Sequence, residues 1–331
     1  MTEHSLGRLA TDPALEASIA AGMSRVEAML VDAIQSDYPF VTQASHHLVA
    51  AGGKRFRPLL TLLAAQYGDP DRAEVFKAAV VVELTHLATL YHDDVMDEAA
   101  LRRGAPSANA RWDNTVAILT GDFLFSRASD ILADLGPEAV RIQARTFERL
   151  CTGQIRETVG PDIGMDPVKH HLQVLADKTG SLIATSGRFG AMMSGADAYV
   201  VDTMTRFGEA IGIAFQLADD IVDITSDSHQ SGKTPGTDLR EGVPTLAGLY
   251  ALASTDGTDA RLQDLLSRPL PDDAEHAEAL ALLRDHVSLA EARAEAHRWA
   301  DDARRALDGL PDGAATEALT LLCDYVVDRT G

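Results

Sequence analysis

The chain has 331 residues, of which 46% are hydrophobic and 5% aromatic, and its formal net charge is −21. This apolar content excludes a disordered chain, and the length suffices for one large domain or two modest ones. The acidic balance argues against broad recognition of nucleic-acid phosphates, which requires a basic face. We therefore expect a folded protein that binds no nucleic acid.

Cysteine usage and hydropathy predict the cellular compartment of the protein. The two cysteines, Cys151 and Cys323, form neither a disulfide framework nor a metal-ligand pattern. The first residues show no secretory signal pattern, and no apolar stretch is long enough to cross a bilayer. We expect a cytoplasmic protein with no integral membrane segment.

Helical periodicity covers most of the chain. Apolar residues recur at spacings of three and four, which predicts amphipathic or buried helices, and no alternating run is long enough to predict a sheet. The predicted helices are residues 15–34, 72–100, 115–134, 137–159, 167–194, 198–226, 244–254 and 275–308. We expect an all-α fold, with a loose N-terminus over 1–12 and one helical domain over 13–331.

Glycine and proline mark the expected breaks between these helices. They gather in the segments 52–58, 102–106, 160–164 and 226–244. The last segment is the longest polar insertion, and a loop of that length in a compact domain is usually functional or disordered.

A short acidic motif occurs twice, as DDVMD at 93–97 and DDIVD at 219–223. In the first copy, Asp93 and Asp97 lie four residues apart and therefore on one helix face, with Asp94 beside them. Negative charges near a helix C-terminus oppose the macrodipole, so this arrangement is unfavourable unless cations compensate it. The repeat of the same unfavourable cluster predicts metal binding.

The candidate ligands indicate which metal. All of them are hard carboxylate oxygens, which favours Mg²⁺ over zinc or copper. Mg²⁺ usually takes one or two protein carboxylates and completes its shell with water and substrate phosphates. The alternative is that these aspartates are merely solvated at the ends of helices. This alternative explains a single motif better than it explains a matched pair. The candidate ligands are Asp93, Asp94, Asp97, Asp219, Asp220 and Asp223.

Basic residues cluster despite the acidic composition. Lys54, Arg55 and Arg57 lie together in GGKRFRP, and their charges suit a diphosphate, although a solvated turn is an alternative for Arg55. His86 lies two turns before the first acidic motif and is interpreted as a phosphate donor, with a buried core histidine as the alternative. Glu83 is expected to pair with it. An E-x-x-H di-iron site would need a second such motif, which the sequence lacks.

These motifs, in this order over about residues 45–250, resemble the trans-polyprenyl diphosphate synthase family: GGKRFRP, ELTHLATLYHDDVMDEAALRRGAPSAN, DKTGSL and AFQLADDIVDITSDSHQSGKTPGTDL. The resemblance implies an all-helical bundle of ten or more helices around a central cavity, usually a homodimer. It also implies joining of isopentenyl diphosphate to a dimethylallyl, geranyl or farnesyl diphosphate with release of pyrophosphate. About two to three Mg²⁺ ions would assist ionisation, condensation and elimination.

The resemblance also implies residue roles. Metal binding would fall on Asp93, Asp97 and Asp219, supported by the other three aspartates of the two motifs. The isopentenyl diphosphate site would comprise Lys54, Arg57, His86 and Arg103. The allylic diphosphate would meet Arg102, Lys178 and Lys233, with Thr179 and Gln216 facing the developing carbocation. Many relatives carry a further lysine where this chain has Val243, so either Arg240 or Lys233 makes that contact or the contact is absent.

Side-chain size before the first acidic motif predicts product length. Ala88 and Thr89 are small, Thr85 one turn deeper is modest, and short-chain relatives commonly place aromatic residues at that level. We expect a medium-to-long product, such as a quinone side-chain precursor. The alternatives are a shorter-chain (geranylgeranyl or farnesyl) synthase, a class I terpene cyclase and a non-catalytic helical subunit.

Overall fold

The computed structural model describes residues 12–226 and 235–328. They form two compact units. The first unit comprises Met1–Phe147, Leu182–Gly208 and Leu307–Leu321, and the second comprises Glu148–Ser181, Glu209–Ala306 and Leu322–Gly331. One domain over 13–331 stays a prediction, and the loose segment expected over 1–12 lies, apart from Asp12, outside the described residues.

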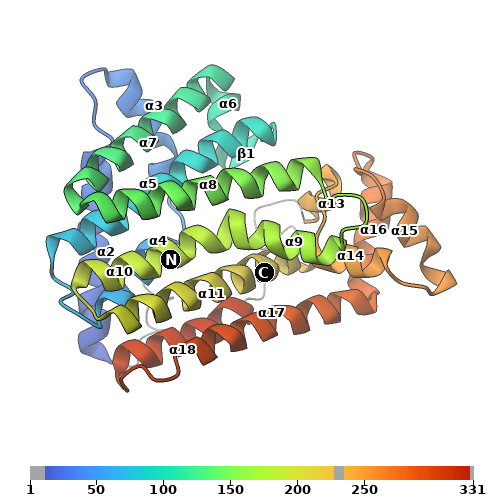
Figure 1. Cartoon of the computed structure of the whole chain (residues 1–331). Helices are drawn as coiled ribbons and strands as arrows, with labels where there is room; N and C mark the ends of the chain where they lie inside the picture. The colour runs from blue at the N-terminus through green and yellow to red at the C-terminus, as the bar shows by residue number, and fades with distance from the viewer. Residues whose placement is uncertain (1–11, 227–234, 329–331) are drawn as a thin grey trace. The chain divides into compact units, whose positions relative to one another are not determined.

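The expected all-α class is confirmed, since helices make up nearly all regular structure of the described residues (Figure 1). The elements that lie wholly in the first unit are α2 (Pro13–Ala33), α3 (Pro39–Ala50), α4 (Phe56–Ala65), α5 (Ala73–Met96), β1 (Leu101–Arg102), β2 (Ala105–Pro106), α6 (Ala108–Arg111) and α7 (Asn114–Leu135). The helices divided by the unit boundaries are α8 (Pro137–Val159), α10 (Ser181–Ser194), α11 (Ala198–Thr225) and α18 (Ala314–Val327).

The second unit contains the remaining elements. They are α9 (Pro167–Leu175), the π-helix Ala176–Gly180, α13 (Thr237–Glu241), α14 (Leu246–Leu252), the 3₁₀-helix Gly257–Asp259, α15 (Ala260–Leu266), α16 (Asp273–Asp285) and α17 (Val287–Ala306). The π-helix joins α9 directly to α10, so the three elements together span the single helix predicted over 167–194.

Aspartates begin many of these helices. The side chains of Asp12, Asp113, Asp166 and Asp272 each accept a hydrogen bond from a backbone N–H of the first turn of α2, α7, α9 and α16 respectively. Such caps satisfy donors that the helix leaves unpaired and place negative charge at the positive end of the helix dipole. Part of the acidic composition therefore serves the fold.

The helices differ from the prediction in several places. The structure adds α3, α15 and α18, which the periodicity did not single out. Helix α4 begins at Phe56, inside the segment 52–58 that was predicted as a break. The predicted helix 275–308 is two helices, because His286 adopts an extended conformation between α16 and α17.

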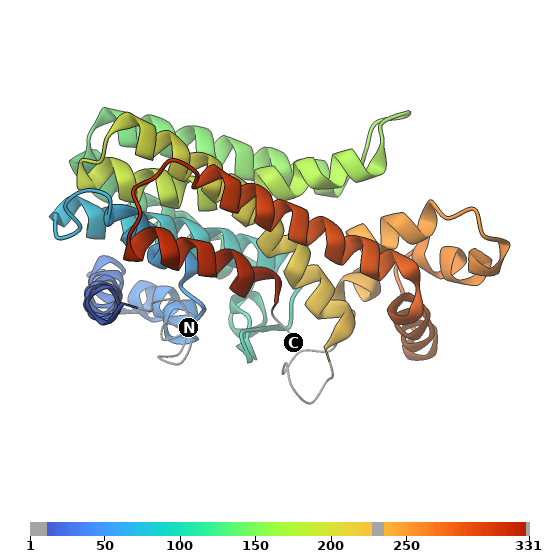
Figure 2. The same cartoon turned by 90° about the horizontal axis from the view of Figure 1, so that it is seen from below.

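Helix α5 is a long, largely buried helix of the first unit. Leu84, Leu87 and Tyr91 are fully buried, and α5 and α7 lie side by side in both views (Figures 1 and 2). The Tyr91 hydroxyl donates to the carbonyl oxygen of Ala44 at 2.5 Å and accepts from the backbone N–H of Leu48 at 3.2 Å, which fixes α3 against α5. Polar side chains on such a helix need a specific reason to be there.

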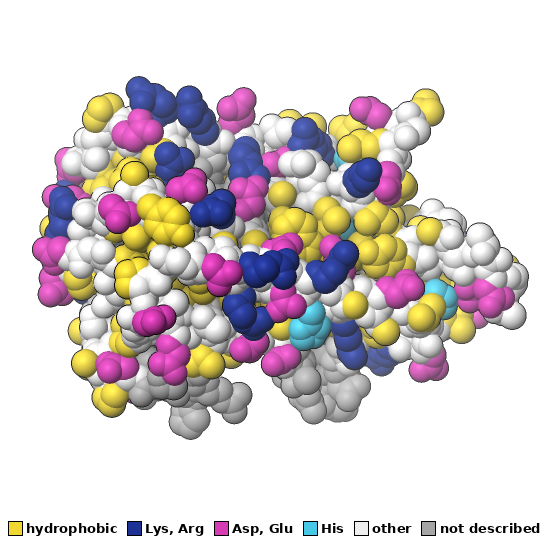
Figure 3. Space-filling model, turned by 60° about the horizontal axis from the view of Figure 1, so that its bottom comes forward, with side chains coloured by type: hydrophobic (Ala, Val, Ile, Leu, Met, Phe, Trp, Pro, Cys, Tyr) yellow, Lys and Arg dark blue, Asp and Glu magenta, His cyan; other side chains and the backbone are white. Residues whose placement is uncertain are grey.

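The second unit has its own core. Leu217, Leu265, Leu283 and Leu289 are buried members of one cluster, in which α14 and α16 pack beside α17, and α15 packs against α14 and α16 (Figure 2). Within the described residues, no helix is long and apolar enough to cross a membrane. On the face drawn in Figure 3, lysine and arginine side chains are interspersed with aspartate and glutamate.

Candidate active site

A tight hairpin presents two of the predicted basic residues. Strands β1 and β2 pair antiparallel through the two-residue loop Arg103–Gly104. Both loop residues have positive φ, 54° and 77°, as a type I′ turn requires, and glycine suits the second position. The RRGAP segment is thus a rigid turn that places Arg102 and Arg103 after the first acidic motif.

The first acidic motif ends α5. Arg102 Nε donates to Asp94 Oδ1 at 2.5 Å, and Arg102 Nη2 lies 3.6 Å from Asp97 Oδ2. Asp94 is fully buried, yet its Oδ2 atom has no hydrogen-bond partner in the described part of the chain. Arg102 was expected at the allylic diphosphate. That role stays a prediction; in this structure Arg102 partly compensates the acidic cluster, and Asp94 Oδ2 keeps no partner among the described residues.

Arg55 belongs to the internal structure of the first unit. Its guanidinium is buried and forms ion pairs with Glu27 at 2.5 Å and Glu83 at 2.8 Å. The solvated-turn interpretation of Arg55 is therefore wrong, and Glu83 pairs with Arg55 rather than with His86. A backbone φ of 47° at Arg55 allows this inward orientation between Lys54 and the start of α4.

Arg57, Arg103 and His86 form a cationic group with few acceptors. The Nε atom of Arg57 is buried without a hydrogen-bond partner among the described residues. Burial lowers the pKa of Arg57 to about 10, and neighbouring Arg103 lowers it further while Glu83 raises it. Burial and the surrounding arginines hold the pKa of His86 well below its usual value, so the imidazole is neutral. Within the described residues, Glu83 opposes these charges only in part, and Arg57 Nε keeps no acceptor.

Carbonyl groups at the end of α3 position Arg103. Its Nη1 atom donates to the carbonyl oxygen of Leu48 at 3.2 Å and to that of Gly52. Burial lowers the pKa of Arg103, with Glu83 opposing the shift. Lys54 lies exposed in the turn that follows α3. The structure therefore brings Arg57, His86 and Arg103, three of the four residues predicted for the isopentenyl diphosphate site, into one electrostatic group.

The predicted chain-length residues lie on α5 within the first unit. Ala88 is fully buried, and the partly buried Thr89 donates to the carbonyl oxygen of His86 at 2.8 Å. One turn earlier, the buried Thr85 hydroxyl accepts from Gln143 Nε2 at 2.7 Å and donates to the carbonyl oxygen of Val81 at 2.8 Å. No motif in the sequence pointed to Gln143, which comes from α8.

The second unit holds the remaining predicted residues that the structure describes. Lys178 Nζ donates to Glu157 Oε2 at 2.6 Å. The Thr179 hydroxyl donates to Gln216 Oε1 at 3.1 Å, and Gln216 Nε2 donates to Asp220 Oδ1 at 2.9 Å. This chain of hydrogen bonds fixes the Gln216 amide and links Thr179 to the second acidic motif. Lys233 lies outside the described residues.

The second acidic motif lies on α11 and includes a partner that the sequence analysis missed. Burial raises the pKa of Asp220 well above its usual value, Asp238 raises it further, and the hydrogen bond from Gln216 opposes the shift. Burial, and then the charge of Asp223, raises the pKa of Asp238 to about 7. The backbone N–H of Asp238 donates to Asp223 Oδ2 at 3.3 Å. A fourth carboxylate thus joins this cluster from α13.

Arg240, one of the two residues considered as a substitute for the missing family lysine, already has partners in the described structure, and the other, Lys233, lies outside it. Arg240 Nη2 forms an ion pair with Asp273 at 2.9 Å, and Arg240 Nη1 donates to the carbonyl oxygen of Pro271 at 3.1 Å. The Val243 side chain carries no charge, and its backbone N–H donates to the carbonyl oxygen of Asp238 at 2.8 Å.

The carboxylate donors of the two motifs suit Mg²⁺, which needs few protein ligands, better than a metal that needs a complete set of them. Across residues 12–226 and 235–328, no three His, Cys, Asp or Glu side chains converge as a ready ligand set. Mg²⁺ does not require one, because it keeps several waters and phosphate oxygens and takes only one or two carboxylates. The unpartnered Asp94 Oδ2 and the mutually repelling Asp220, Asp223 and Asp238 are donors of that kind.

Comparison with known proteins identifies the family. Residues 38–283 match the polyprenyl synthetase family. The nonaprenyl diphosphate synthase of Mycobacterium tuberculosis is 51% identical over 97% of this chain and 96% of its own length. The chain belongs to the polyprenyl synthetase family and is a prenyltransferase.

Solved structures agree with this assignment. A geranylgeranyl pyrophosphate synthase of Corynebacterium glutamicum, complexed with calcium and isoprenyl diphosphate, is 48% identical, with a TM-score of 0.87 over 97% of this chain and 99% of its own. A polyprenyl synthase of Caulobacter crescentus, in a complex with the same ligands, is 33% identical, with a TM-score of 0.90 over 98% of each chain. The isoprenoid-synthase type of fold predicted from the sequence is confirmed.

Proposed function

We propose that this chain is an all-trans polyprenyl diphosphate synthase with a medium-to-long product, which condenses isopentenyl diphosphate with an allylic diphosphate and releases pyrophosphate. One observation carries the proposal. On and beside α5, Arg57 Nε and Asp94 Oδ2 are buried atoms without hydrogen-bond partners in the described structure, and their charges are opposite. Buried polar atoms of this kind are costly unless a ligand satisfies them. A diphosphate and its divalent cation would supply both partners.

The proposal assigns roles to the residues of the first unit. Arg57, Arg103 and neutral His86, with Lys54, hold the isopentenyl diphosphate, since guanidinium groups bind phosphate oxygens in a fixed geometry. Asp93 and Asp97, with Asp94, hold magnesium. Arg102 then exchanges its carboxylate partners for the allylic diphosphate.

The proposal also assigns roles to residues of the second unit. Asp219, with Asp220 and Asp223 in support, holds magnesium, and the bound ions supply Lewis-acid stabilisation of the leaving pyrophosphate. Lys178 and Lys233 add positive charge where negative charge develops. The dipoles of Thr179 and Gln216, fixed by their mutual hydrogen bond, face the developing allylic cation.

Pyrophosphate release tests the proposal. Purified protein is supplied with farnesyl and isopentenyl diphosphates, with and without Mg²⁺, and the products are separated by length. The proposal expects release that requires Mg²⁺ and both substrates. Release from farnesyl diphosphate alone would indicate a terpene cyclase, and no release would indicate a non-catalytic helical subunit.

Ala88→Phe is expected to shorten the product. Because Ala88 is fully buried on α5, a phenyl ring there occupies volume that a growing prenyl chain would otherwise use. The product distribution, measured by chromatography, should shift by at least one isoprene unit. Ala20→Phe places the same ring on the exposed face of α2 and should change nothing. An unchanged distribution in folded Ala88→Phe would show that this layer does not limit the chain.

A geranylgeranyl synthase is the second candidate, and the Thr85–Gln143 hydrogen bond favours it. This buried polar contact lies one turn beyond Ala88, and Gln143 Oε1 has no partner in the described structure. An apolar chain that passed this layer would meet a desolvated amide. If the layer closes the cavity, Gln143→Ala should lengthen the product, as measured by the same chromatography. A parent enzyme that already makes long products would exclude this candidate.

We further propose a homodimer that works in the cytoplasm, as expected from the family resemblance and the sequence. Ile118 and Leu119 on α7 have 42% and 60% of their surface exposed, which supports an apolar contact with a second copy.

A further inference from the structure

The π-helix Ala176–Gly180 carries both Lys178 and Thr179. A π-turn holds one residue more than an α-turn, is rare, and often occurs at functional sites. Removing the extra residue would rotate the neighbouring side chains by about 100°, the angle that one residue spans in an α-helix. The direction in which Lys178 and Thr179 point therefore depends on whatever stabilises this turn.

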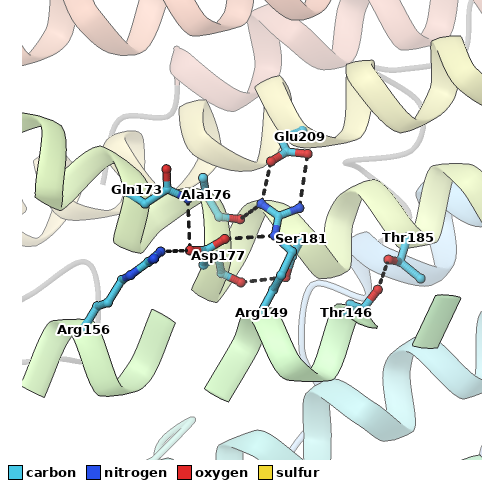
Figure 4. Close-up of polar contacts among 9 residues, drawn as sticks. All are labelled: Thr146, Arg149, Arg156, Gln173, Ala176, Asp177, Ser181, Thr185 and Glu209. Carbon is cyan, nitrogen blue, oxygen red and sulfur yellow. Dashed lines mark hydrogen bonds and ion pairs between the residues drawn. The ribbon is translucent and has the colours of Figure 1, made fainter. Parts of the chain in front are cut away.

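Asp177, inside the turn, is the buried centre of an ionic cluster whose other members are partly exposed (Figure 4). Its side chain is only 6% exposed and forms an ion pair with Arg149 Nε at 2.9 Å and another with Arg156 Nη1. Gln173 Nε2 donates to its Oδ2 atom at 3.0 Å. Glu209 binds the far side of Arg149 at 2.6 Å and so fixes that guanidinium in place.

The same cluster satisfies the backbone of the π-helix. Arg149 Nη2 donates to the carbonyl oxygen of Ala176 at 3.2 Å, and the Ser181 hydroxyl donates to that of Asp177 at 2.6 Å. An inserted residue disturbs the regular ladder of backbone hydrogen bonds, and side-chain donors compensate here. Arg149 therefore contacts both the side chain and the backbone of the turn.

One face of α8 receives the turn. Arg149, Gly153, Arg156 and Glu157 are spaced by four, three and one residues, which places them on the same side of the helix. A Cβ atom at Gly153 would lie 2.8 Å from the backbone nitrogen of Lys178, so only glycine allows this approach. This face of α8 thus fits the π-turn as it stands, and a shift of the turn would require α8 or the turn to rearrange.

We propose that Asp177 is a positioning residue, which through its ion pairs with Arg149 and Arg156 holds the π-turn in the form that directs Lys178 and Thr179 to the allylic substrate. The inference rests on the proposed function. Lys178 binds Glu157 in this structure and must leave that partner when it binds a diphosphate. It cannot then hold the turn itself. The contacts of Asp177 do not involve the substrate and persist.

Asp177→Asn tests the inference, because asparagine keeps the shape of the side chain and removes its charge. We expect KM for farnesyl diphosphate to rise at least about tenfold, since small misplacements of positioning groups have effects of that size, with KM for isopentenyl diphosphate unchanged. Arg261→Gln is the matched control, because it removes an exposed ion pair with Glu278 in the same unit. Both of its KM values should stay within about twofold of the parent. A thermal unfolding midpoint is recorded for each variant.

A double-mutant cycle separates positioning from general stabilisation. In a Lys178→Ala background, Asp177→Asn should raise KM for farnesyl diphosphate less than about threefold, because one of the two groups that it positions is already gone. An equal loss in both backgrounds, or an equal rise in the two KM values, overturns the inference. If Asp177→Asn does not fold, Arg156→Gln keeps the Arg149 pair and should show the same KM split.

The outcome is distinguishable from a failure of the proposed function. A parent protein that releases no pyrophosphate contradicts that function. Calorimetric binding of farnesyl diphosphate with Mg²⁺ would still report on Asp177, and the expected result is an affinity at least about tenfold weaker in Asp177→Asn. Unchanged affinity overturns the inference whether or not the parent is active.

Discussion

Asp93→Ala and Asp219→Ala are each expected to lower turnover by at least about 10³-fold, because metal-assisted stabilisation of a leaving group is among the largest catalytic contributions. Asp93 lies on α5 in the first unit and Asp219 on α11 in the second, so the two variants test the acidic motifs separately. The measurement is the steady-state rate of pyrophosphate release at saturating substrates and Mg²⁺. Chelation of Mg²⁺ should abolish the activity of the parent, and restoring the metal should recover it.

The control for these variants is another aspartate of the acidic chain. Asp130 on α7 has a side chain that is 76% exposed and lies 3.8 Å from Arg127. Exposed pairs of this kind contribute little, so Asp130→Ala should retain the parental rate. If Asp93→Ala and Asp219→Ala fold, as judged by circular dichroism, and still release pyrophosphate at the parental rate, the two motifs are not the metal sites.

The periodic helices and the motifs at their ends could be predicted from the sequence. Helix α5 was expected as 72–100 and spans Ala73–Met96, and its apolar character on every side made His86 and Asp94 conspicuous. The short helices α3 and α15 were missed. In α3, β-branched residues and two histidines weaken the local helical preference. Hydrogen bonds between the Tyr91 hydroxyl and the backbone of α3 stabilise this helix from outside the segment.

Residues that act through tertiary contacts could not be predicted. Gln143 sits in an ordinary amphipathic stretch of α8, and only the fold brings its amide to Thr85. Asp177 stands beside the recognised Lys178, but its two arginine partners are 28 and 21 residues away in the chain. The sequence indicated Asp238 only weakly, because it follows the glycine-containing segment SGKTPGT after the second acidic motif. Its charge becomes significant only next to Asp223.

The two arginines of GGKRFRP should respond differently to the same substitution. Arg57→Met is expected to raise KM for isopentenyl diphosphate about 10- to 100-fold, because hydrogen bonds to charged groups contribute about 1.5–3 kcal/mol each. KM for the allylic substrate and the unfolding midpoint should change little, since Arg57 Nε has no partner in the described structure that would be left unpaired. Steady-state kinetics with each substrate varied in turn measures the difference.

Arg55→Met should act on stability instead. Arg55 is buried and pairs with Glu83, whose side chain is 2% exposed, so its removal leaves a buried carboxylate without its cation. Breaking a buried ion pair in this way costs about 3–5 kcal/mol, which calorimetry or denaturant titration would detect as a lower free energy of unfolding. The protein that remains folded should keep a near-parental KM for isopentenyl diphosphate. The opposite pattern, with Arg57 needed for stability and Arg55 for substrate affinity, would reverse the assignment of this turn. That assignment depends on one difference between the two side chains: Arg55 already pairs with Glu83, whereas Arg57 Nε has no partner among the described residues.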